Sequence, residues 1–224
     1  VDRDEYIPVF DSYAHRRNEE LGYAGRNVGL MVYYNFKDKR PDFPFSYAAG
    51  VFRNNSYVTS AYARGSWHHD GLATSFGYAM LARSGDDAIT THGISADAGY
   101  RTDAAETSLE FFYAQDPEEG IRRRLLERDE KVFTAGLRSL SALRFDIDGD
   151  VVEIIEPHVM LTLYAPDAAF SEYHTVEILL GVNIFLDDDV RLRLVADGLL
   201  TRDRFAEEYS THGSVFATEV FIRF

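Results

Sequence analysis

The sequence predicts an all-β protein, a transmembrane antiparallel up-and-down β-barrel of which about eleven strands are visible. Three observations favour this class. Apolar and polar residues alternate with period two from Val28 onward. The connections expected at one end of the strands are mostly short, and those at the other end are mostly long. The chain also ends on an aromatic residue inside an alternating segment, SVFATEVFIRF.

Composition narrows the classes of structure and partner. No apolar run approaches the about 18 residues that a membrane-spanning helix requires. The net charge of −14 and the pI near 4.8 argue against nucleic acid as a partner, because phosphate contacts need a basic surface. The absence of cysteine excludes a disulfide or a thiolate metal site. We therefore expect no cofactor and no metal, and acidic loops that keep the protein soluble.

The alternating segments follow one another along the chain. In order they are VGLMVYYNF, FSYAAGVF, YVTSAYARGSWH, LATSFGYAMLAR, ITTHGISADAGYR, ETSLEFFYAQ, VFTAGLRSLSALRF, VVEIIEPHVMLTLYA, YHTVEILLGVNIFL, VRLRLVADGLLT and the terminal segment. In the sixth, Leu109 and Phe111 lie on the face opposite Glu106 and Glu110. Their lengths are comparable to the about 9–11 residues that a tilted strand needs to cross a bilayer.

The connections sort by length if the C-terminus lies on the periplasmic side. Short turns are then expected there at residues 69–71, 102–104, 148–150 and 187–189, with a longer connection at 37–44. On the opposite side, residues 53–56 and 84–87 are short, whereas 116–130, 165–172 and 202–213 are long. The stretch EEGIRRRLLERDEK predicts a short helix in one long loop. DIDGD at 146–150 fits a hairpin turn better than a calcium loop, because the later Glu ligand is missing.

The expected strands divide the chain into two parts, and their odd number has two possible explanations. We expect residues 1–27 to form a charged outer loop and residues 28–224 to form the barrel strands, ending in a C-terminal closing strand. Eleven is odd, whereas bacterial single-chain barrels close with an even number. Either residues 1–27 hide a twelfth strand, or the chain lacks the N-terminal part of a larger barrel. We favour the second alternative.

Two stretches, GYAGRNVGLMVYYNF and FPFSYAAGVFRNN, resemble the phosphate-selective porin O/P-like family of bacterial outer-membrane porins. The matching residues are Gly25, Arg26 and Gly29, followed by Tyr47, Gly50, Val51, Phe52 and Asn54. Asn55 stands where the family usually has glycine. The resemblance covers residues 20–55, and the alternation beyond is shared by many porins.

The resemblance implies a sixteen-stranded homotrimeric porin with five further strands upstream. Its partners would be outer-membrane lipids, lipopolysaccharide and small hydrophilic solutes. Residues 1–27 would be the loop that folds inward and narrows the pore, and an ordinary surface loop is the alternative. The charged candidates for that constriction are Arg3, Asp4, Glu5, Arg16 and Arg17.

Candidate pore-lining residues lie opposite the apolar stripes. They are Arg138, Arg144, Arg191, Arg193, Asp197, Glu106, Glu110, Glu156 and Glu177. An arginine facing lipid at the midplane would cost about 2–4 kcal/mol, which assigns these arginines to the lumen. They form either an anion-attracting wall or a set neutralised by the carboxylates, and the acidic composition favours the second. The direction of Arg64 stays open, and phosphate selectivity does not follow from the family name.

No set of residues predicts catalysis. His92 and Ser95 have opposite parity on one strand, and His68 and His69 flank a short turn. A nucleophile, a base and an orienting group do not come together, so we expect no catalytic residues. The prediction is a passive, water-filled outer-membrane channel for small hydrophilic solutes or ions. The alternatives are a twelve-stranded barrel with an enzymatic (lipid hydrolase) or structural role and, third, a soluble antiparallel sandwich.

Overall fold

A computed structural model describes most of the chain from Val28 onward. The described residues are 28–35, 44–53, 58–85, 88–126, 131–147, 149, 151–169, 174–186, 190–202 and 210–222. The elements are β1 (Val28–Asn35), β2 (Phe45–Arg53), β3 (Val58–His69), β4 (Leu72–Arg83), β5 (Ile89–Arg101), β6 (Ala105–Gln115), α2 (Pro117–Leu125), β7 (Phe133–Leu143), β8 (Phe145–Asp146), β9 (Ile154–Ala165), β10 (His174–Phe185), β11 (Val190–Arg202) and β12 (Ser210–Ile222).

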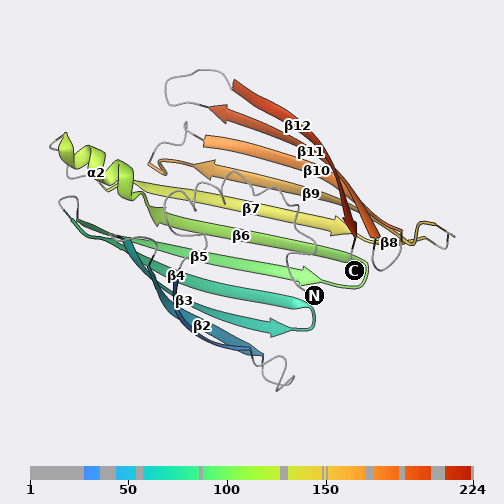
Figure 1. Cartoon of the computed structure of the whole chain (residues 1–224), viewed down its shortest axis with the longest axis horizontal. Helices are drawn as coiled ribbons and strands as arrows, with labels where there is room; N and C mark the ends of the chain where they lie inside the picture. The colour runs from blue at the N-terminus through green and yellow to red at the C-terminus, as the bar shows by residue number, and fades with distance from the viewer. Residues whose placement is uncertain are drawn as a thin grey trace.

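The strands form one antiparallel sheet in sequence order. Each strand pairs with the strands before and after it in the chain, with one exception. The two-residue β8 pairs only with β9, and β7 also pairs directly with β9. The strands lie side by side in a twisted sheet, with α2 beyond one end and β8 at the other (Figure 1). We call these the α2 end and the β8 end. The up-and-down prediction is confirmed, and the eleven longer strands are the eleven predicted ones. Within the described residues β1 and β12 form the two edges and are not paired with each other.

The sheet has two chemically different faces, which β9 shows most clearly. Val159, Leu161 and Leu163 are 42%, 40% and 39% exposed, whereas Glu156 and Thr162, which alternate with them, are buried. We call the first the outer face and the second the inner face. The alternation follows from the period of two in a strand, which sends successive side chains to opposite faces.

The predicted turns at 69–71 and 102–104 are confirmed. The other predicted connections lie wholly or partly outside the described residues. Asp70 and Gly71, between β3 and β4, have φ of 43° and 79°, the positive pair that a tight two-residue hairpin requires. A Cβ at Gly71 would overlap the Arg101 carbonyl, so only glycine fits there. The last outer loop was predicted too long: β12 begins at Ser210, and a bulge opposite Gly198 and Leu199 lengthens the paired segment.

The predicted helix is present as α2 but ends earlier than the charged stretch. Asp116 begins it, because its carboxylate accepts hydrogen bonds from the backbone N–H groups of Glu118 (2.9 Å) and Glu119 (3.0 Å). No helix within the described ranges is long and apolar enough to cross a membrane. The predicted outer loop, residues 1–27, and the terminal Phe224 lie outside the described residues.

Candidate functional site

The strand register sets charged side chains of the inner face in a row. Asp97, Glu110 and Arg138 are successive cross-strand partners on β5, β6 and β7. Arg138 forms an ion pair with Glu110, and both side chains keep part of their surface exposed. The pairing follows from register alone, since residues directly opposite on neighbouring strands share a face.

Arg64, whose direction the sequence left open, lies on the inner face and extends this row. Its Nη2 donates to Asp97 Oδ2 at 2.7 Å, and its Nε donates to Ser75 Oγ at 2.9 Å. Ser75 in turn donates to the same Asp97 carboxylate. Arg64 and Arg138 therefore both lie on the inner face of β3–β7, each with a carboxylate partner.

A second row, across β9, β10 and β11, is almost fully buried. Glu156, Asn183 and Arg193 are opposite one another and are 4%, 0% and 1% exposed. Asn183 Nδ2 donates to Glu156 Oε1 at 2.8 Å, and Arg193 Nε donates to Asn183 Oδ1 at 3.0 Å. The neutral amide thus bridges a buried anion and a buried cation, with one hydrogen bond to each.

An apolar cluster lies beside this row on the inner face. Leu140, Met160, Leu179 and Val195 come from β7, β9, β10 and β11 and are buried. Glu177, on the same face, is buried as well. Most of the inner face of β9–β11 is therefore buried, whereas the ion pairs of β3–β7 keep about a fifth to a third of their side-chain surface exposed.

The β8 end carries a polar cavity of about 340 Å³. Its charged lining residues are Arg101, Asp103, Glu106, Arg144, Asp146 and Glu156. Its ion pairs are longer than those of the first row: 3.9 Å between Arg101 Nε and Glu106 Oε2, and 3.5 Å between Arg144 Nε and Asp146 Oδ1. Two further candidates lie outside this cavity. The guanidinium carbon of Arg191 lies 5.7 Å from the ring centre of Phe185. Asp197 is half-buried on the inner face of β11.

All nine candidate pore-lining residues thus fall on the inner face or in its cavity, although whether they contact a solute stays a prediction. The five constriction candidates, between Arg3 and Arg17, lie outside the described residues. Sequence reasoning missed Asn183 and Ser75, because an isolated amide or hydroxyl carries no charge signal until register sets it between charged partners.

One contact missed by sequence reasoning bears on catalysis. Ser46 Oγ lies 3.2 Å from His68 Nε2, across the β2–β3 pair. His92 and Ser95 point to opposite faces as expected, and His92 Nδ1 lies 2.6 Å from Tyr78 Oη on the outer face. A Ser–His contact alone does not activate the serine as a nucleophile, because the histidine base must itself be oriented by a third group. Among the described residues no group of three or more His, Cys, Asp or Glu could hold a metal ion.

Comparison with solved structures supports the fold. An anion-selective porin from Comamonas acidovorans superposes with a TM-score of 0.59 at 15% sequence identity. The fold is porin-like. The match covers 84% of this chain but 53% of that porin, so the chain spans about half of its length.

No protein-family model matches the chain, and no curated protein matches its sequence. The porin-like fold is thus established by structural likeness, whereas the narrower resemblance to the phosphate-selective O/P-like family gains no support.

Proposed function

We propose that the protein is a porin of the bacterial outer membrane, a passive, water-filled channel for small hydrophilic solutes or ions. The observation that carries the proposal is the segregation of the two faces. On the outer face, large apolar side chains are exposed along most strands, including Leu109, Leu137, Leu161 and Ile178. Exposed patches of this extent are a liability in water but are what a barrel presents to lipid.

The inner face supplies the polar path. Because the inner-face arginines Arg64 and Arg138 each pair with a carboxylate, the lumen gains little net charge from them. We therefore expect weak ion selectivity rather than the anion selectivity stated in the name of the Comamonas acidovorans porin. The resemblance over residues 20–55 supports a homotrimer in contact with outer-membrane lipids and lipopolysaccharide, as a further part of the proposal.

Conductance across a planar bilayer tests the channel. The protein, purified in detergent, should insert and give discrete ohmic steps, whereas heat-denatured protein should give none. Purification without detergent, together with no current, would refute the proposal. Fractionation of the source cells tests the location, because the protein should follow the outer membrane.

Reversal potentials under a salt gradient test the lumenal charges with a matched pair. Arg138→Gln should shift the potential towards cation preference, and Glu110→Gln should shift it towards anion preference. The double variant should return close to the unmodified channel. Arg193→Gln is the buried control and should shift the potential less than Arg138→Gln. Equal potentials in all four variants would mean that these side chains do not line the path.

The hydrolase alternative can be tested on the same preparation. The observation that favours it is the contact between Ser46 and His68. Hydrolysis of phospholipid or short-chain esters should be absent from the purified protein. Hydrolysis that disappears in Ser46→Ala, with the conductance unchanged, would establish an enzyme.

A further inference from the structure

The connection between β6 and β7 contains α2, and α2 packs against the inner face at the α2 end. Arg83 and Ile89 are cross-strand partners there and share the face of Asp97. Arg83 Nη2 lies 3.6 Å from Glu118 Oε1 of the helix. A Cβ at Gly120 would lie 3.3 Å from Ile89 Cδ1, so the helix backbone lies directly over the Ile89 side chain.

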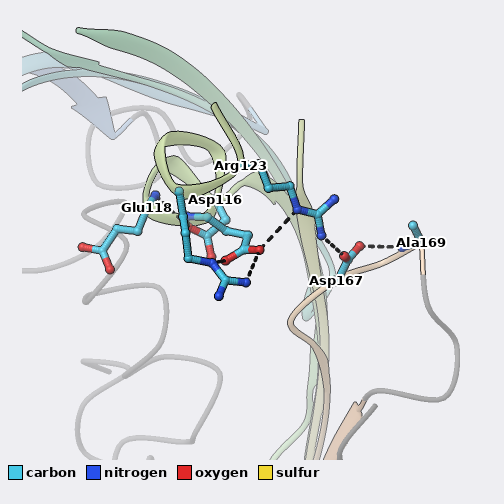
Figure 2. Close-up of polar contacts among 7 residues, drawn as sticks. Asp116, Glu118, Arg123, Asp167 and Ala169 are labelled. Atoms are coloured by element: carbon cyan, nitrogen blue, oxygen red, sulfur yellow. Dashed lines mark hydrogen bonds and ion pairs between the residues drawn. The ribbon is translucent and has the colours of Figure 1, made fainter. Parts of the chain in front are cut away.

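A second set of contacts holds the other side of the helix. Figure 2 shows Arg123 reaching from α2 to Asp167, in the connection that follows β9. Arg123 Nη2 donates to Asp167 Oδ2 at 2.8 Å, and Arg123 Nε donates to Glu119 Oε1 at 3.2 Å. The Arg123 and Asp167 side chains are only 17% and 12% exposed, so solvent screens this ion pair less than a surface pair.

Backbone hydrogen bonds tie both connections to the start of β7. The N–H of Asp116 donates to the Val132 carbonyl at 2.9 Å, and that of Ala168 donates to the Phe133 carbonyl at 2.7 Å. Asp167 is itself oriented, because its Oδ1 accepts the N–H of Ala169 at 3.1 Å. The helix is therefore anchored on β4–β5 at one side and on the connection after β9 at the other.

We propose that α2 narrows the channel mouth at the α2 end, and that Arg123 is the positioning residue that holds it over the inner face. The inference rests on the proposed porin function and goes beyond it, since the constriction candidates from the sequence all lie in residues 1–27. Arg122, on the same helix, has a side chain that is 70% exposed. Its guanidinium is paired with Glu119 at 2.7 Å, so entering solutes would meet the bulk of this side chain rather than an added net charge.

The absence of cysteine from the sequence allows a clean test. Arg122→Cys, labelled with a bulky thiol reagent in a planar bilayer, should lose part of its single-channel conductance. The matched control is Thr90→Cys, at the same end of the sheet but exposed on the outer face. It should take up the label, as mass spectrometry would show, without a change in conductance.

The positioning role of Arg123 has its own readout. In the Arg122→Cys background, Arg123→Ala and Asp167→Ala should each weaken the label-induced loss of conductance. Combined, the two should weaken it no further than either alone, because they break the same ion pair. A strand signal in circular dichroism that matches the parent protein establishes that the barrel is intact.

The outcomes separate the two proposals. An unmodified protein that never conducts refutes the porin function. A conducting channel whose Arg122→Cys variant is fully labelled yet keeps its conductance refutes the constriction by α2. A label effect that survives unchanged in Arg123→Ala and Asp167→Ala refutes the role of Arg123.

Discussion

Asn183→Ala is expected to lower the free energy of unfolding by about 3 kcal/mol or more. The variant removes one hydrogen bond to the Glu156 carboxylate and one to the Arg193 guanidinium. Hydrogen bonds to charged groups contribute about 1.5–3 kcal/mol each, so two of them give about 3 kcal/mol at the lower limit. The two charged groups also stay buried without their shared partner, which adds a desolvation cost.

Unfolding by denaturant in detergent micelles measures the effect. The sequence contains one tryptophan, Trp67 on β3, whose fluorescence reports the transition. A lower midpoint at an unchanged slope would indicate a loss of stability with the same surface exposed. Leu180→Ala, on the outer face of the same strand, is the matched control, because its side chain is exposed. If Asn183→Ala cost no more than this control, the amide would not hold the buried charges together.

Three further predictions concern packing and the helix. Gly136→Val should lower the free energy of unfolding by about 1–3 kcal/mol, because the new side chain would overlap the Phe112 ring. Gly65→Ala, which meets open space, should leave the denaturation midpoint unchanged. The hydrogen bond from Arg122 holds the pKa of Glu119 below its ordinary value of 4.5. The ionised Glu119 carboxylate therefore stabilises α2 fully above pH 4.5, and this stabilisation is lost as the pH falls through the lowered pKa of Glu119. Amide exchange in α2, corrected for intrinsic rates, should accelerate over that range, and Glu119→Gln should abolish the pH dependence. Asp116→Ala removes the N-terminal cap, should destabilise α2 by about 1 kcal/mol, and should speed exchange of the same amides at neutral pH.

Alternation predicted the faces well because the two sides of a barrel strand meet different environments. A slip of one residue would move a whole strand's apolar set to the wrong face, so the pattern is strongly selected. Arg138 shows this, since its neighbours Leu137 and Ser139 lie on the opposite face. The face of Arg64 could not be assigned in the same way, because the large aromatic residue Tyr62 lies on the same face of β3 as the charged Arg64.

Contacts between strands were harder to predict, because they depend on register. Asn183 lies in a largely apolar segment and gives no chemical signal there. Only the pairing of β10 with β9 and β11 sets it between an anion and a cation. Turn residues define register locally at tight hairpins such as Asp70–Gly71. The β9–β11 row is joined through connections whose conformations the sequence pattern does not specify.

The helix at the α2 end marks the limit of pattern reasoning. Composition predicted a helix, and Asp116 is a recognisable cap, because both are local properties. Arg123 and Asp167, however, are 44 residues apart and lie in two connections between strands. Neither period two nor period 3.6 relates them. Their approach depends on β6, β7 and β9 being neighbours, so that both connections leave the sheet at the same end. Charged residues in barrel loops are therefore best assessed after the strand order is known, because that order decides which loops can meet over the mouth.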